Sequence, residues 1–402
     1  MIVKIIAFSN AVFLWAFMHL QKKIELTRLE VYWLVFAVAI LLYNNGDIQN
    51  GEWPSAVFST ATIVLMIVLT CTKGWIDVFM GTLKIFTMIN AIATILFFIF
   101  PELYNAYEPL IFKISKGLYT AGYTAGITNH YSLNGVILSL GSILCFAELL
   151  SRKKGKFETI IFFFIEFLAL ILTTKRAHFL FAIVAMSAIY FLLNRKFTTA
   201  LKIILGMFAA CGLLLFLSNF IPELGFVINR FFGQRDISSG RFNIYKVGFK
   251  MFSESPIFGH GWNQFIYTYT SRYLALLMIG EGYTYIQMHN VYLQLLYEVG
   301  IVGFILVVSL LVNTLIHSIR FQKKFYIDIK KMSERENKYL IFSIAYQIFF
   351  LCYCITGNPL YDAVVYIPYF FSCGIYFTIF KRYSRTFVLH SAKTKLLKPY
   401  SR

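Results

Sequence analysis

Residues 157–194 read FETIIFFFIEFLALILTTKRAHFLFAIVAMSAIYFLLN, two apolar runs that are separated only by the polar turn TTKRAH. Each run is close to the roughly 20 apolar residues that an α-helix needs to cross a bilayer. A turn this short leaves the two runs side by side. The segment therefore predicts a pair of transmembrane helices, over residues 157–174 and 177–194.

The rest of the chain has the same character. Of its 402 residues, 58% are hydrophobic and only 14% are charged, whereas soluble domains carry roughly 25% charged residues. We expect an all-α integral membrane protein, a single polytopic domain over residues 1–402 with about 11 helices (roughly 10 to 12). The further spans are expected over residues 2–20, 30–44, 54–71, 76–100, 131–150, 200–221, 300–318, 339–357 and 361–380. The first span has no cleavage site and is typical of a retained helix, whereas residues 104–127 are ambiguous.

The distribution of charge predicts the orientation in the membrane. The net charge is +18, but most of the Lys and Arg residues lie in alternate connections rather than on one soluble face. This alternation follows the positive-inside rule and places the N-terminus outside and the basic tail, residues 381–402, in the cytoplasm. We expect no nucleic-acid partner. The six cysteines lie in or beside apolar runs, which indicates packing rather than disulfides or metal ligation.

One connection is far longer than the others. Residues 222–291 contain no long apolar run, and by parity this loop lies outside the membrane. Loops of such length in a compact bundle are functional or disordered. This loop is rich in Tyr, Phe, Trp and Gly, so we expect it to be ordered and to hold the active site.

The outer side carries cations despite the positive-inside trend. They indicate an anionic partner, because arginine matches phosphate oxygens with two parallel hydrogen bonds. Snorkelling to lipid headgroups is the alternative for Arg230 and Arg272. Arg176 joins two spans almost without a loop, so it is expected near the bundle interior. The outer cations are Lys175, Arg176, Arg230, Arg235, Arg241, Lys246, Lys250 and Arg272.

Glu166 lies in the middle of an expected span, where a lone carboxylate is costly. We expect a structural role for it, either paired with a basic or amide group or protonated.

A polar pair begins the last motif, MHNVYLQLLYEVGIVG over residues 288–303. His289 and Asn290 are followed by nine residues, Gly300, two residues and Gly303. This spacing resembles the H-[NSQ]-x9-G-x2-G pattern of the O-antigen ligase and Wzy-type polysaccharide polymerase superfamily. From the residues alone, Asn290 is a candidate helix N-cap, and the two glycines would allow close helix packing.

Two further blocks are similar to the same family, and the likeness covers residues from about 130 to 380. In SSGRFNIYKVGFKMFSESPIFGHGWNQF, Arg241 matches the arginine of an R-x-x-x-W…P-x-x-G-x-G block, and Tyr245 stands where tryptophan is common. The turn residues of that block are Pro256, Gly259 and Gly261. In LTTKRAHFLF, Lys175 stands in the place of the serine of an S-R-G-A segment, Arg176 matches the arginine, and Ala177 and His178 replace the last two residues.

The resemblance implies a membrane glycosyltransferase of the GT-C type in the cytoplasmic membrane of a bacterium. The implied donor is a glycan on undecaprenyl diphosphate, transferred to a glycan acceptor at the outer face of the bilayer. A chain-length regulator and a flippase are candidate partners. The implied catalytic residues are His289, Arg241 and Arg176, and the candidate substrate-binding residues are Lys175, Arg235, Asn290 and Tyr245.

The chemistry of glycosyl transfer agrees with these residue types. A leaving diphosphate needs stabilisation, and the chain has no D-x-D motif and few acids in its long loop. Fixed cations are the remaining means, so we expect no metal and no cofactor. The acceptor hydroxyl must lose a proton, and histidine is a usable base near neutral pH. Without the motif, a helix-start histidine bonded to backbone is the simpler interpretation of His289.

Three functions remain open at this point. A polymerase would join lipid-linked repeat units, and a ligase would move a finished glycan to lipid A core or protein. The composition, rich in Ile, Phe, Lys and Asn, resembles that of low-GC bacteria, which favours the polymerase. A transporter of lipid-linked sugars would need charged residues at several depths of the bundle, and the sequence places few there.

Overall fold

The computed structural model describes residues 26–43, 53–112, 124–151, 157–193, 241–266, 287–328 and 332–396, with the single residues 198, 212, 216, 225 and 268. The described chain is helical and contains no strand, as the apolar runs predict. The expected spans at 2–20 and 200–221 lie outside these ranges. The described part of the long loop includes the helix α11 and further helical residues from Phe265.

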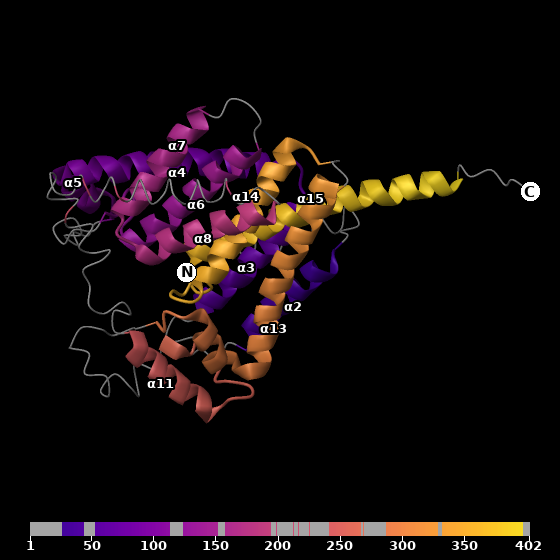
Figure 1. Cartoon of the computed structure of the whole chain (residues 1–402). Coiled ribbons are helices and arrows are strands. Elements are labelled where there is room, and N and C mark those ends of the chain that lie inside the picture. The colour runs from indigo at the N-terminus through magenta and orange to yellow at the C-terminus, as the bar shows by residue number, and fades with distance from the viewer. Residues whose placement is uncertain are drawn as a thin grey trace, which may run out of the picture.

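The helices follow the expected order, and most of their bounds are close to the predicted ones. They are α2 (Arg28–Leu42), α3 (Trp53–Thr70), α4 (Trp75–Ile99), α5 (Pro101–Phe112), α6 (Tyr131–Ser151), α7 (Phe157–Leu172), α8 (Arg176–Leu192), α11 (Arg241–Glu254), α13 (Val291–Gln322), the π-helical turn η3 (Lys323–Asp328), α14 (Glu334–Tyr353) and α15 (Ala363–Leu396). Figure 1 shows α11 below the bundle, beside the lower part of α13.

Four stretches in the described part of the chain are long and apolar enough to cross a membrane. They are Trp75–Ile99, Tyr131–Ser151, Val291–Tyr326 and Ala363–Ser384. Ala56–Thr70 and Arg176–Leu192 are shorter apolar helices. The chain is therefore a helical membrane protein, while the count of about 11 spans stays a prediction.

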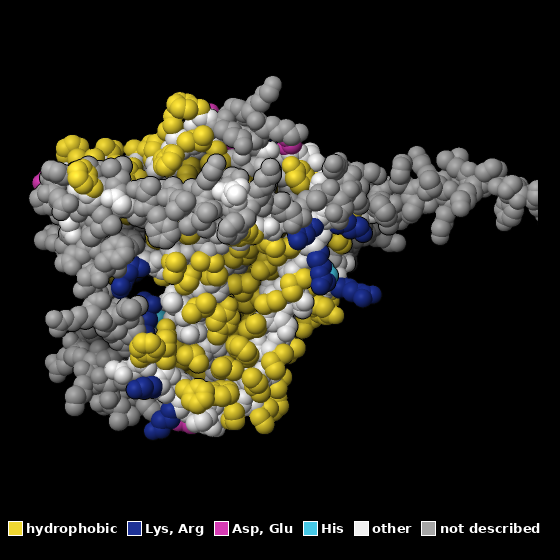
Figure 2. Space-filling view, in the orientation of Figure 1, with side chains coloured by type: hydrophobic (Ala, Val, Ile, Leu, Met, Phe, Trp, Pro, Cys, Tyr) yellow, Lys and Arg dark blue, Asp and Glu magenta, His cyan; other side chains and the backbone are white. Residues whose placement is uncertain are grey.

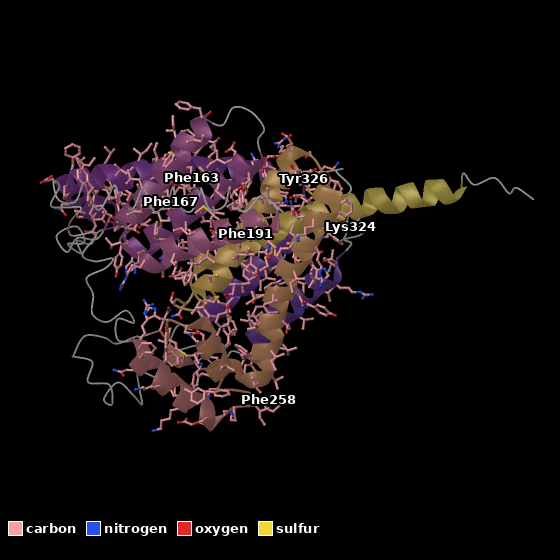
Figure 3. The ribbon with its side chains drawn as sticks, in the orientation of Figure 1. Phe163, Phe167, Phe191, Phe258, Lys324 and Tyr326 are labelled. Carbon is pink, nitrogen blue, oxygen red and sulfur yellow. The ribbon has the colours of Figure 1, made fainter. Side chains whose placement is uncertain are left out.

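Helix α6 lies inside the bundle, in contact with α4, α7, α8 and α14. It is buried along nearly its whole length, and its Gly and Ser residues allow the neighbouring helices to approach closely. Aromatic side chains fill much of the remaining interior; on α7, Phe163 and Phe167 stack with ring centroids 5.5 Å apart (Figure 3). By contrast, α13 exposes a hydrophobic face (Figure 2) at Ile301, Val302, Ile305 and Leu306.

One predicted bound was wrong. Helix α13 begins at Val291, not near residue 300, because the polar Gln294 and Glu298 that lower its hydropathy are buried and hydrogen-bonded to each other. The short helix α5 covers the start of the segment that the sequence left ambiguous. Helix α15 continues to Leu396, whereas the part of it that is apolar enough to span a membrane ends at Ser384, close to the predicted residue 380.

The bundle interior holds more charge than the sequence reading placed there. Lys84 on α4 forms an ion pair with Glu148 on α6 at 3.0 Å. Lys381 on α15 donates to Glu30 at 2.6 Å. Glu166 is fully buried, and neither of its carboxyl oxygens has a hydrogen-bond partner in the described chain, so the expected pairing with a basic or amide group is absent there.

Candidate functional site

His289 lies where the long loop meets α13, at a backbone position that several contacts fix. Its φ of 53° lies in the left-handed region. The next residue, Asn290, caps α13 by accepting a hydrogen bond from the Leu293 N–H at 3.1 Å, as predicted. Beyond the cap, the Val291 N–H donates to the Cys354 carbonyl at the end of α14 (2.9 Å). These contacts hold His289 between α13 and α14.

Helix α11 packs against this junction through one apolar face. Ile244, Gly248 and Met251 are buried at helical spacing, and a Cβ on Gly248 would lie only 2.5 Å from the Met288 side chain. Close contact at Gly248 therefore brings α11 against the residue that precedes His289. This packing places Arg241 and Tyr245, on the first turns of α11, beside the histidine.

Tyr245 connects Arg241 to His289. Its hydroxyl donates to the His289 carbonyl at 3.1 Å and interacts with the Arg241 side chain by a hydrogen bond. Burial raises the pKa of Tyr245 despite the charge of Arg241, so the hydroxyl keeps its proton. The tyrosine hydroxyl can both donate to the carbonyl and accept from Arg241, which an indole N–H could not do.

Two cations act on the His289 ring. Burial lowers the pKa of His289 to about 4, and the positive charges of Arg241 and Lys175 add to this shift. The imidazole is therefore neutral at pH 7, as a proton acceptor must be. Arg241 is itself anchored, because its Nη1 donates to the Thr356 carbonyl beyond α14 at 2.7 Å.

Lys175 reaches the same place from the TTKRAH turn. Thr174 has a φ of 59°, which turns the chain sharply so that α8 begins at Arg176. The Lys175 Nζ lies 4.0 Å from the centroid of the Tyr131 ring, at the start of α6. Arg176, half-buried, is the first residue of α8. Figure 2 shows Lys and Arg side chains beside a histidine left of centre, at the border of the grey atoms.

Four helices begin at this cluster, namely α6, α8, α11 and α13. A helix N-terminus carries partial positive charge, which favours an anion nearby. The N-termini therefore add to the charges of Lys175 and Arg241. The arrangement suits a phosphate or diphosphate group next to a neutral imidazole.

Glycines from two of the sequence motifs, the 288–303 motif and the P-x-x-G-x-G block, meet at a break in α13. Gly300 has φ 62° and ψ −174° inside the helix, a conformation that essentially only glycine adopts. A Cβ on Gly300 would overlap the Ile257 carbonyl, and a Cβ on Gly259 would lie 2.5 Å from the Glu298 carbonyl and the Gly300 nitrogen. Gly300 thus serves a loop-to-helix contact, rather than the helix-to-helix packing that the sequence predicted.

The loop over residues 256–261 supplies the hydrogen bonds that the break removes. His260 and Gly261 donate their N–H groups to the Tyr297 and Glu298 carbonyls, at 3.2 and 2.8 Å. In return, the N–H groups of Ile301 and Val302 donate to the Pro256 and Ile257 carbonyls, at 2.9 and 3.4 Å. Phe258, at the tip of this loop, lies near one end of α13, and Tyr326 marks the other (Figure 3).

Glu298 is a buried residue that the sequence reading did not single out. Its carboxylate accepts from Gln294 at 2.9 Å, from Tyr361 at 2.6 Å and from the Phe265 N–H at 3.3 Å. It therefore ties α13 to the loop after α11 and to the connection between α14 and α15. The sequence feature that could have identified Glu298 is a carboxylate inside the apolar motif MHNVYLQLLYEVGIVG.

An apolar pocket of about 380 Å³ opens between α4, α5, α6 and α15. Leu133 in the pocket wall follows Tyr131 by two residues, so the pocket lies on the side of α6 opposite Tyr131 and Lys175, near the same end of the helix. The wall consists of Leu83, Phe86, Phe112, Ile127, Thr128, Asn129, Leu133, Ile137, Leu140, Val364 and Pro368.

The remaining predictions about the site are not all tested. Arg235, Arg230 and Arg272 lie outside the described residues. Within the described ranges, no group of three or more His, Cys, Asp or Glu residues could hold a metal ion. Metal independence therefore stays a prediction.

Residues 161–308 match a family model described as O-Antigen ligase. The matched region contains the TTKRAH turn, α11, the 256–261 loop and the His289 motif. It confirms the predicted resemblance to the O-antigen ligase and Wzy-type polymerase superfamily over that part of the chain. No curated protein matches the chain.

Proposed function

We propose that this protein is a polymerase that joins undecaprenyl-diphosphate-linked oligosaccharide repeat units of a bacterial surface polysaccharide, at the outer face of the cytoplasmic membrane. The observation that carries the proposal is the neutral imidazole of His289 in the field of Lys175 and Arg241. A base and an anion site side by side are what glycosyl transfer from a diphosphate requires.

In the proposed reaction, an acceptor hydroxyl attacks the anomeric carbon of the donor glycan. A new C–O bond forms, the bond from that carbon to the diphosphate oxygen breaks, and the electron pair leaves with the diphosphate. His289 takes the proton of the hydroxyl. Lys175, Arg241 and the helix N-termini stabilise the negative charge on the leaving group.

Arg176 and Arg235 complete the proposed phosphate site, and Asn290 and Tyr245 hold the backbone of His289. The apolar pocket near the start of α6 supports a lipid-linked donor, because it offers a place for part of a polyprenyl tail. We propose that the reaction needs no metal.

A ligase is the second candidate, favoured by the description of the matching family model. Its chemistry at the donor would be the same, and only the acceptor would differ. A polymerase makes a ladder of products from the lipid-linked repeat unit alone. A ligase makes product only when lipid A core or an acceptor protein is added.

The test uses the full-length protein in proteoliposomes with a lipid-linked donor and with EDTA present. We expect wild-type protein to release polyprenyl diphosphate and extend the glycan, and His289→Ala to lower the rate by about 100-fold to 10,000-fold. Turnover by His289→Ala at the wild-type rate would contradict the base assignment. Complete loss of wild-type activity in EDTA would contradict the metal-independent mechanism.

A further inference from the structure

His178 is a second histidine at the cation cluster, and its hydrogen bonds are missing. It lies on the first turn of α8 with only 2% of its surface exposed. Neither Nδ1 nor Nε2 has a hydrogen-bond partner among the described residues. Buried polar groups in folded proteins are nearly always paired, so an imidazole without a partner among the described residues is a candidate for binding a ligand.

Packing alone does not account for a histidine here. The ring lies 4.5 Å from the ring of Tyr353 and 6.3 Å from that of Phe349, measured between centroids. A phenyl ring would fill this aromatic environment without unpaired nitrogens. Gly135 on α6 leaves room for the ring, because a Cβ there would lie 3.3 Å from Cγ and 3.4 Å from Nδ1 of His178.

The position of His178 connects it to the site of His289. The charges of Lys175 and Arg241 act on both imidazoles. The Gly135 position that faces the His178 ring also lies against the Lys175 side chain, since a Cβ there would be 3.4 Å from the Lys175 Cβ. Both rings therefore lie in the field of the same two cations. An anion held by that pair would be close to both.

We propose that His178 binds the donor directly: one imidazole N–H donates a hydrogen bond to an oxygen of the diphosphate held by Lys175 and Arg241. The inference rests on the proposed function and deepens it, because it divides the work between two histidines. His289 takes the acceptor proton, whereas His178 transfers no proton and stabilises the leaving group.

The experiment measures binding of inorganic pyrophosphate to the detergent-solubilised full-length protein. His178→Phe keeps an aromatic ring but removes the donor, and we expect affinity to fall by about 10-fold or more, the usual effect of a hydrogen bond to a charged group. His178→Asn keeps a donor and is expected to retain most of the affinity. The matched control is His317→Phe, which changes an exposed histidine on α13 and should bind as the wild type does.

A second measurement follows the ring itself by NMR of ¹⁵N-labelled histidine. Pyrophosphate should shift the imidazole resonances that are absent from His178→Phe. Equal affinity of His178→Phe and the wild type, while Arg241→Gln binds more weakly, would overturn the role of His178 and leave the proposed function standing. Failure of the wild type itself to bind pyrophosphate or polyprenyl diphosphate would instead overturn the proposed function.

Discussion

At the scale of single residues, the low pKa of His289 decides when it can act. A base with a pKa of about 4 is always neutral at pH 7 but accepts a proton weakly, since a base works best near its own pKa. A bound diphosphate would offset the charges of Arg241 and Lys175 and so raise the pKa. Burial, the larger cause of the shift, would remain. The donor would therefore strengthen the base that its own transfer requires.

We therefore expect kcat/KM and kcat to fall at two different pH values on the acid side. The kcat/KM of the free enzyme should stay level as pH falls below neutrality and decline only near pH 4, where His289 becomes protonated. The acid limb of kcat, which reports the donor complex, should lie at higher pH, towards the ordinary value of about 6.5. Identical limbs for kcat and kcat/KM would show that the cations do not control His289. Steady-state rates in proteoliposomes between pH 4 and 8 measure both.

At the scale of helices and loops, the break in α13 explains why two glycine motifs occur in one chain. At this point, neither the helix nor the 256–261 loop can pair all of its backbone N–H and C=O groups within itself. Four hydrogen bonds between Pro256, Ile257, His260, Gly261 and the residues around Gly300 replace those that the helix lacks. The loop follows α11, so the break fixes α11 and with it Arg241 and Tyr245.

Alanine at Gly300 should therefore destabilise the protein and move the site. The Cβ would overlap the Ile257 carbonyl in a backbone region that other residues avoid, and we expect a loss of about 3 kcal/mol. Gly81→Ala on α4 is the control, because its Cβ would meet nothing within 4 Å and helix propensity predicts a gain of about 1 kcal/mol. Thermal unfolding in detergent compares the two variants. Equal melting temperatures would contradict the importance of the break.

The sequence could predict the helices but not this contact. Hydropathy finds α4, α6 and α7 within a few residues because their apolar runs end where the helices do. It fails at the start of α13 because a buried Glu298 looks like a loop residue until Tyr361 and Gln294 are known to bind it. The glycine spacing marks Gly300 as special, yet no pattern tells which distant loop enters the break.

Glu166 and Glu148 allow opposite predictions for two carboxylates in one region. Glu148 is paired with Lys84 at 3.0 Å. Glu166 has no partner for its oxygens in the described chain; Thr87 faces it, but the Thr87 hydroxyl donates to the Lys84 carbonyl at 3.3 Å. Glu166→Gln removes an unpaired ionisable group and should raise stability by about 1 kcal/mol. Glu148→Gln breaks a pair and should lower it by about 3 kcal/mol. Detergent melting curves test the signs, and a loss in both would contradict this account.

At the scale of the whole molecule, composition is enough to identify an integral membrane protein, because the chain has too few charged residues to cover a soluble surface of this size. The site combines segments more than 100 residues apart, with Lys175, Arg241 and His289 on three different helix starts. The resemblance to a family named these three residues. It could not name Tyr353, Thr356 or Cys354, because residues at the end of α14 contribute through a position in space that no sequence pattern marks.

Helix α6 contributes to both the cation site and the apolar pocket. Helix α6 carries Tyr131 under Lys175 at its first residue and pocket-wall residues from Leu133 onward. We expect a lipid-linked donor with its diphosphate at the cations to reach the pocket by passing around the start of α6, because Tyr131 and Leu133 lie on opposite sides of this helix. A soluble pyrophosphate would use the cations only.

Filling the pocket should therefore weaken the use of a polyprenyl-linked donor without changing the binding of pyrophosphate. Leu133→Trp is expected to lower the kcat/KM for a polyprenyl-linked donor by about 10-fold, since each CH₂ group kept out of an apolar site costs about 0.8 kcal/mol. Pyrophosphate affinity should stay unchanged. Leu306→Trp is the control, because Leu306 is 66% exposed on the hydrophobic face of α13 and a tryptophan there can face lipid. An equal loss in both variants would assign the effect to the bilayer, and weaker pyrophosphate binding by Leu133→Trp would mean that the pocket and the cation site are not separable.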